Sequence, residues 1–357
     1  MKFRSLLKLS LILAVGYCHA SSDTLNSSAV EEIRFESAHF EIAGNLYLPN
    51  SFANSKSPLV IWVSGSGPSF RTVKARQTIR LINCFLDAGI AYFRIDKPGS
   101  GDSKGELSDD KLFEQLSQIV VDAVNVLKTH RKIDPDLIGL FGSSQAGYIM
   151  PLAIANSHYI KFMIGSSCPG ENSIDQWNYL IEKQMICEEI SPERAAKNVE
   201  MFSILRSTNN KEEFDGAINY FVTNPMIVKS LNYDSTFADR ARQWWPREIN
   251  ENDESHFNPI SIIEKIKIPV FMIYGDKDTQ VDPIQAIEAY KNALEKAGNS
   301  LYQISMIKGV DHNMCPSATG CLNEITEQNR AGTYSYSEKY YDVVKNWIEI
   351  LKNHYKN

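Results

Sequence analysis

The sequence lacks the features that mark membrane-spanning and repeat proteins. After the first twenty residues, no stretch reaches the 18 or so consecutive apolar residues of a membrane helix, so no stable membrane insertion is expected. Internal repeats and low-complexity tracts are also missing, which argues against solenoid architectures. What remains is a chain of 357 residues, long enough for one large core or two modest domains.

Charge and cysteine spacing argue against two further classes of partner. The chain has 37 Lys and Arg residues against 43 Asp and Glu, a formal net charge of −6. A nucleic-acid-binding surface needs clustered cations for the phosphates, so nucleic acid is not an expected partner. The six cysteines include no second cysteine or histidine pair at zinc-like intervals, and no metal site is expected.

The N-terminal segment has the layout of a secretory signal peptide. Lys2, Arg4 and Lys8 precede an apolar run over residues 9–16, and Cys18-His19-Ala20 follows with small residues for a peptidase. The sequence predicts a signal peptide over residues 1–20, cleaved after Ala20, and a periplasmic or secreted mature protein. A lipid anchor on Cys18 ranks second, because the preceding residue is a bulky tyrosine.

Export gives the remaining cysteines an environment that permits disulfides. Cys315 and Cys321 enclose the short segment Pro-Ser-Ala-Thr-Gly. This short separation predicts a local disulfide between them, which would restrain the loop that begins at His312.

Short apolar segments alternate with helical patterns along most of the chain. After an alternating stretch at 31–48 that suggests antiparallel strands, apolar runs occur at 59–63, 90–95, 137–141, 270–274 and 301–307. Strand–helix alternation of this kind predicts an α/β fold, with a mostly parallel central sheet and helices on both faces.

The alternation stops between residues 171 and 259, where the chain is polar and mostly helical in pattern. The sequence therefore predicts a core built from residues 21–170 and 260–357, with a helical lid insertion over 171–259. Trp244 and Trp245 lie in this insertion. They are candidates for lining a substrate pocket, and packing of the lid onto the sheet is the alternative role, which is expected for at least one of them.

Two adjacent serines follow the apolar run at 137–141, in the segment Gly142-Ser143-Ser144-Gln145-Ala146-Gly147. A nucleophile on a sharp strand-to-helix turn needs small residues two positions before and two after it. Ser144 meets this condition, whereas Ser143 is flanked by Phe141 and Gln145. Ser144 is therefore the candidate nucleophile, and a plain glycine–serine turn is the alternative.

A serine nucleophile needs a base and an acid that orients the base. In folds with this elbow, acid and histidine follow the serine in that order. His312 lies in the loop after the 301–307 segment and is the candidate base. Asp278, beyond the 270–274 segment, is the preferred acid over Asp276, which is closer to the turn, and Asp282, which can cap the next helix.

The same chemistry needs backbone N–H groups that stabilise the tetrahedral oxyanion. The N–H of Gln145 follows the nucleophile directly and is the first candidate. The N–H of Ser66 is the second, because it lies in the glycine-containing loop Ser64-Gly65-Ser66-Gly67-Pro68 after the 59–63 segment.

Together these residues resemble the α/β-hydrolases, and within them the exported bacterial esterase-like branch related to dienelactone hydrolases and prolyl-oligopeptidase-like serine peptidases. The resemblance covers roughly residues 31–170 and 260–350. Its marks are Gly65-Ser66-Gly67-Pro68 with Arg71, Asp96-Lys97-Pro98-Gly99-Ser100-Gly101, the elbow motif, Gly275-Asp276-Lys277-Asp278, and Asp311-His312. Ser64 replaces the usual histidine and Ala146 the usual glycine, but neither change removes a catalytic group.

The leading hypothesis is a serine hydrolase that cleaves carboxylic esters or thioesters of small molecules through Ser144, Asp278 and His312, with no cofactor. A serine peptidase of the same fold is the first alternative, although the sequence has no obvious propeller or long N-terminal domain that would restrict access to peptides. A non-catalytic binding protein on a hydrolase scaffold is the second, and the intact set of three residue types counts against it.

Overall fold

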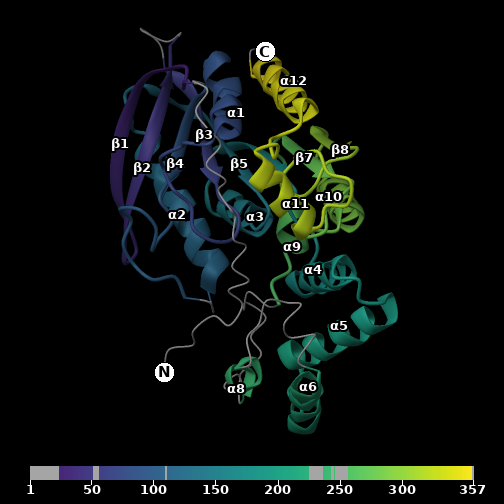
Figure 1. Cartoon of the computed structure of the whole chain (residues 1–357). Helices are drawn as coiled ribbons and strands as arrows, with labels where there is room; N and C mark the ends of the chain where they lie inside the picture. Colours follow the sequence, from purple (N-terminus) through teal and green to yellow (C-terminus); the bar gives the residue numbers. More distant parts are fainter. Residues whose placement is uncertain are drawn as a thin grey trace.

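A computed structural model describes residues 24–50, 56–108, 111–224, 236–242, 245 and 256–355 (Figure 1). The segment assigned to the signal peptide and Trp244 lie outside the described residues. Within the described part of the chain, no helix is long and apolar enough to cross a membrane.

One sheet of eight strands forms the centre of the fold, with strand order β1-β2-β4-β3-β5-β6-β7-β8. Strands β3 to β8 pair in parallel, while β1 and β2 form an antiparallel hairpin that joins β4. This arrangement confirms the predicted α/β-hydrolase fold class. The strand bounds are Ser27–Ser37 (β1), Phe40–Pro49 (β2), Ser57–Val63 (β3), Ala91–Ile95 (β4), Ile133–Ser143 (β5), Ile160–Ser166 (β6), Val270–Gly275 (β7) and Tyr302–Ile307 (β8).

Helices cover both faces of this sheet (Figure 1). Helices α2 (Leu112–Leu127), α3 (Ala146–Asn156) and α10 (Pro283–Ala297) pack into one apolar cluster with the sheet. Helices α1 (Arg76–Asp87) and α12 (Glu338–His354) pack into a second cluster, on the opposite face. The central strands are therefore buried on both sides, which explains their nearly continuous apolar sequences.

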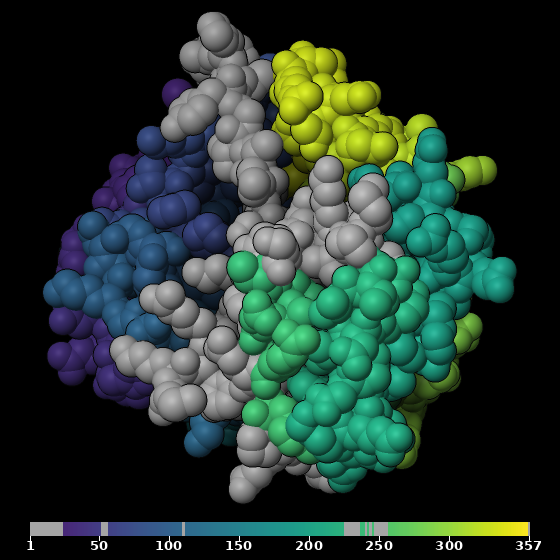
Figure 2. Space-filling model, turned by 60° about the horizontal axis from the view of Figure 1, so that its bottom comes forward, coloured from purple at the N-terminus to yellow at the C-terminus, as the bar shows by residue number. Residues whose placement is uncertain are grey.

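A helical insertion separates β6 from β7. It contains α4 (Ser173–Cys187), α5 (Pro192–Ser207), α6 (Lys211–Thr223), α8 (Phe237–Arg242) and α9 (Ile260–Ile263). Phe202, Phe214, Phe221 and Phe237 form the centre of a separate apolar cluster inside it. In Figure 2 the described residues of the insertion, coloured teal to green, form a compact group beside the blue residues of the core. Its action as a lid remains a prediction.

Candidate active site

The turn between β5 and α3 has the backbone geometry of a nucleophile elbow. Ser143 is the last residue of β5, and Ser144 has φ +54°, in the left-handed region that a side chain rarely adopts. The Ser144 N–H donates to the carbonyl of Ser166 at 3.0 Å, and the Gly147 N–H donates to the carbonyl of Ser144 at 2.8 Å. These bonds hold the strained residue at the carboxyl edge of the sheet.

The small neighbours of Ser144 are required by packing. A Cβ atom placed on Gly142 would lie 2.5 Å from the Cβ of Ala146 and 2.9 Å from the carbonyl oxygen of Val63. Such contacts are too close for any side chain, so position 142 accepts glycine alone. The same contact shows why residue 146 must be small, and why alanine suffices there.

His312 and Asp278 form a buried pair. The Nδ1 atom of His312 lies 2.8 Å from Oδ2 and 3.0 Å from Oδ1 of Asp278. Both side chains are almost wholly buried, with residue exposures of 7% for His312 and 3% for Asp278. Asp278 also accepts the backbone N–H groups of Gln280 and Val281 at 2.8 and 2.9 Å. These bonds orient the carboxylate toward the imidazole.

The two competing aspartates have other partners. Asp276 accepts the backbone N–H of Gly309 in the loop that carries His312. Asp282 caps α10, because its carboxylate accepts the N–H groups of Ile284 and Gln285. Of the three candidates, Asp278 is the one whose carboxylate the structure brings to His312.

The pKa of His312 reflects two opposing effects. Burial alone would lower it, but the negative charge of Asp278 and the hydrogen bond to it raise the pKa above its usual value.

The loop that carries His312 is held by Asp311, which accepts hydrogen bonds from the Tyr334 hydroxyl and from the N–H groups of Asn313 and Cys315. Desolvation raises the pKa of Asp311, whose carboxylate these donors surround.

Ser144 and His312 open into one cavity of about 790 Å³. Ser66 and Gln145, the candidate oxyanion donors, line the same cavity. A Cβ on Gly65 would lie 3.1 Å from the Cβ of Ser144, so the loop that carries Ser66 approaches the elbow closely. Gln145 is the N-cap of α3, where the first N–H groups have no partner within the helix. Both candidate donors therefore lie at the cavity into which Ser144 opens.

The cavity also has an apolar wall that the sequence did not indicate. It is formed by Phe113 of α2, Tyr148 of α3, Pro169, and Trp177 and Leu180 of α4. Trp245, the described member of the predicted pair, is not among the lining residues and packs against Phe214 inside the insertion, at a ring distance of 5.2 Å. The sequence around Trp177 has the pattern of an ordinary amphipathic helix, and this pattern does not indicate that the side chain faces the cavity.

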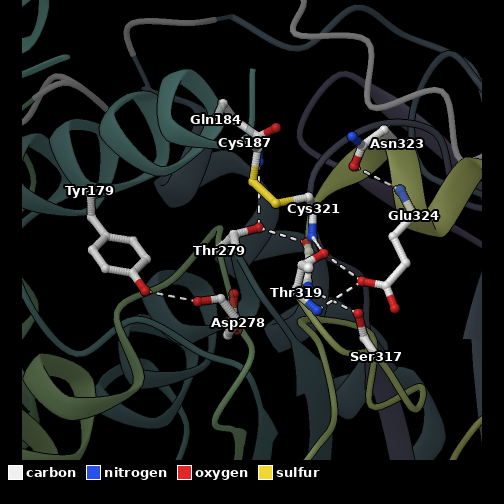
Figure 3. The surroundings of a disulfide bond; sticks show 11 residues. Tyr179, Gln184, Cys187, Asp278, Thr279, Ser317, Thr319, Cys321, Asn323 and Glu324 are labelled. Carbon is white, nitrogen blue, oxygen red and sulfur yellow. Dashed lines mark hydrogen bonds between the residues drawn. A yellow bond between two sulfur atoms is a disulfide. The ribbon is translucent and has the colours of Figure 1, made fainter. Parts of the chain in front are cut away.

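The prediction of a Cys315–Cys321 disulfide is wrong. Cys321 bonds to Cys187 at the end of α4, which is 134 positions away in sequence (Figure 3). Cys315 is a free, buried thiol. The physical reason is the turn held by Asp311, which accepts the Cys315 N–H and draws this residue into the interior, whereas Cys321 is the N-cap residue of α11 (Leu322–Ala331) beside α4.

The disulfide belongs to a set of contacts between α4 and the turn that carries the acid (Figure 3). The Tyr179 hydroxyl donates to the backbone carbonyl of Asp278 at 2.8 Å, and Gln184 donates to the Thr279 hydroxyl at 3.5 Å. The Thr279 hydroxyl in turn donates to the carbonyl of Gly320, next to Cys321, at 2.8 Å. The first helix of the insertion is thereby fixed to the segment that positions Asp278.

We expect peptide mapping without reductant to recover a linked pair of peptides containing Cys187 and Cys321. Reduction should lower the free energy of unfolding by roughly 2–5 kcal/mol, because the crosslink closes a long loop in the unfolded chain. Chemical denaturation with and without reductant measures this difference. A peptide pair linking Cys315 to Cys321, or equal stability in both conditions, would contradict the assignment.

Within the described residues, no group of three or more His, Cys, Asp or Glu side chains is arranged to hold a metal ion. The site combines a serine on an elbow, a histidine paired with a carboxylate, and candidate backbone donors around one cavity. These groups are the ones that acyl transfer requires.

The chain is similar in sequence to one protein family and similar in fold to several solved structures. Residues 71–315 match the family described as serine aminopeptidase, S33. No curated protein sequence matches the chain. Similar solved structures include an acylaminoacyl peptidase from Pyrococcus horikoshii (16% identity, TM-score 0.51, 90% of this chain and 41% of that one) and an α/β hydrolase, GrgF, from a Penicillium species (16%, 0.50, 91% and 99%).

A third similar structure is dipeptidyl peptidase 4 from Porphyromonas gingivalis, with 13% identity and a TM-score of 0.50. The match covers 85% of this chain and 35% of that one. The chain therefore spans well under half the length of both peptidases. At these identities the structural matches show a shared fold, and the match over residues 71–315 carries the family assignment.

Proposed function

We propose that this chain, which belongs to the serine aminopeptidase S33 family of α/β-hydrolases, is a serine hydrolase that cleaves carboxylic esters or thioesters of small molecules. The observation that carries the proposal is the buried His312–Asp278 pair at 2.8 Å, whose imidazole opens into the same cavity as Ser144 on its strained elbow. This combination supports acyl transfer through a covalent intermediate.

In the proposed mechanism, the Oγ atom of Ser144 attacks the carbonyl carbon while Nε2 of His312 takes its proton. Asp278 holds the Nδ1–H tautomer and stabilises the imidazolium that forms. The N–H groups of Ser66 and Gln145 donate to the oxyanion. His312 then returns the proton to the leaving group, and a water molecule, deprotonated by the same histidine, hydrolyses the acyl-enzyme.

The apolar wall of the cavity favours an ester with a hydrophobic acyl or alcohol group. Phe113, Tyr148, Trp177 and Leu180 offer aromatic and aliphatic surface close to Ser144. Peptide hydrolysis by the same triad is the second candidate. It is favoured by the description of the family and by the two peptidases among the similar structures.

A substrate panel separates these two activities. We expect turnover of p-nitrophenyl esters with graded acyl length and no detectable release of p-nitroaniline from aminoacyl p-nitroanilides, because a serine peptidase cleaves activated esters as well as amides, whereas an esterase cleaves the esters alone. A fluorophosphonate probe should label the protein in either case. Release of p-nitroaniline from the anilides would overturn the ester assignment, and failure to label would favour a non-catalytic scaffold.

We also propose that the protein is exported to the periplasm or beyond. The Cys187–Cys321 disulfide supports this location, because structural disulfides persist in oxidising compartments. The charged and apolar pattern of residues 1–20 supports it independently. Fractionation of producing cells, with mass analysis of the mature N-terminus, tests both the location and cleavage after Ala20.

A further inference from the structure

A buried lysine lies behind the candidate oxyanion hole. Lys97 follows β4 in the segment Asp96–Gly101 and has an exposure of only 6%. Its backbone N–H donates to the carbonyl of Ser69 at 2.9 Å, which anchors the residue beside the loop after β3. Taking a lysine ammonium out of water is costly unless the ammonium finds polar partners. The hydrogen-bond partners of the Lys97 ammonium therefore indicate the role of this residue.

The ammonium of Lys97 joins the two halves of the oxyanion hole. Its Nζ atom donates to the backbone carbonyl of Gly65 at 3.0 Å and to the side-chain Oε1 of Gln145 at 3.4 Å. Gly65 immediately precedes Ser66, one candidate donor, and Gln145 carries the other. These two segments come from different strand–helix units, β3–α1 and β5–α3. Lys97 thus bonds to both at once.

The bond to Gly65 fixes the direction of the Ser66 N–H. The Gly65 carbonyl and the Ser66 N–H belong to one planar peptide unit, and in a trans peptide they point in opposite directions. A cation that holds the carbonyl on its own side therefore turns the N–H to the other side. Glycine at 65 makes this restraint important, because glycine adopts many backbone conformations at little cost.

The charge also strengthens the donor. A cation on the carbonyl oxygen polarises the peptide unit, so its N–H becomes a better hydrogen-bond donor toward a developing negative charge. This effect is larger in the transition state, where the oxyanion carries charge, than in the bound ester, whose carbonyl does not.

We propose that Lys97 is a positioning residue that orients and polarises the Ser66 peptide and fixes Gln145, so that both N–H groups face the oxyanion. The inference rests on the proposed function, since it assigns a role within the same site. Lys97 is not among the residues that line the cavity, so it would act through the Ser66 and Gln145 segments and not on the substrate itself.

The test is Lys97→Met, which keeps the length of the side chain and removes its charge and donors. We expect kcat/KM for the best ester to fall about 10- to 100-fold, below the 10²–10³-fold loss typical of deleting an oxyanion donor. KM should change less than about threefold, because uniform binding is preserved. The affinity for a trifluoromethyl ketone, which forms an oxyanion on the serine, should fall by the same factor as kcat/KM.

Two variants control this result. Lys104→Met removes an exposed lysine seven residues further along the chain, whose ammonium pairs with Glu41, and should leave turnover and ketone affinity unchanged. Lys97→Arg keeps a cationic donor and should retain more ketone affinity than the methionine variant. If Lys97→Met does not fold, as judged by circular dichroism, Lys97→Gln keeps a neutral donor and should lose ketone affinity in part.

The outcomes distinguish failure of the proposed role of Lys97 from failure of the proposed hydrolase function. Ketone affinity as tight as in the wild type, in a folded Lys97→Met or Lys97→Gln protein, would overturn the inference alone. So would a loss of kcat/KM that arises wholly from KM. A wild-type protein that neither labels with fluorophosphonate nor turns over any ester would overturn the proposed function, and the role of Lys97 with it.

Discussion

Replacing Ser144 with alanine is expected to abolish labelling by a fluorophosphonate probe and to lower ester turnover by about 10⁵-fold or more. The Ser144 hydroxyl lies on the residue with φ +54° between β5 and α3, and in the proposed mechanism no other group of the elbow can form the acyl intermediate. A residual rate roughly 10³-fold above that in water should remain, because the cavity and the oxyanion donors are still present. Steady-state kinetics with one short-chain ester, together with the probe, measure both effects.

Ser143→Ala is the matched control for this experiment. Ser143 lines the same cavity but is the last residue of β5, and it lies one position before the left-handed residue, so it does not hold the elbow position of the nucleophile. We expect normal labelling and only a modest change in rate, with both variants folded as judged by circular dichroism. A dead Ser143 variant beside a labelled Ser144 variant would show that the elbow register is off by one residue. Labelling of both would place the nucleophile elsewhere.

The fold and the elbow could be predicted because their causes are local in sequence. Parallel strands buried on both faces need apolar runs, and the turn at Ser144 excludes a side chain at Gly142 because that side chain would collide with Ala146, four residues further on. Chain order left four histidines after Ser144, and His312 was selected among them because it lies in the loop after the 301–307 segment. The choice of Asp278 over Asp276 and Asp282 also followed from local signals, because a residue next to the turn and one next to a helix start have other backbone groups to satisfy.

The remaining parts of the site depend on contacts between distant segments. The partner of Cys321 is 134 residues away in sequence, at the end of α4, so separation alone pointed to the wrong cysteine. Trp177 faces the cavity because α4 is fixed against the turn after β7, and Trp245 packs inside the insertion. Lys97 belongs to a motif that the sequence shares with the α/β-hydrolases. Its bonds to Gly65 and Gln145, however, form only in the folded chain, where the loops after β3, β4 and β5 come together.

Asp278→Asn is expected to lower kcat by about 10⁴-fold while leaving the protein folded, by analogy with the same change in other Ser-His-Asp triads. An asparagine would keep the acceptor for the N–H groups of Gln280 and Val281. Toward His312, however, its amide can donate to Nδ1, which favours the tautomer that carries no lone pair on Nε2 for the Ser144 proton. Asp282→Asn is the matched control, because asparagine caps a helix as well as aspartate does, and its turnover should match the wild type.

The pH dependence of the same variants tests the electrostatic side of this assignment. His312 must be neutral to act as the base, so activity falls as pH decreases through its pKa, which Asp278 raises above the usual value. Removing that negative charge leaves burial as the dominant effect, and burial lowers the pKa. The acidic limb of the kcat/KM profile should therefore move to lower pH in Asp278→Asn, even as the plateau drops. A limb that stays in place, or moves to higher pH, would show that Asp278 is not the carboxylate that supports the base.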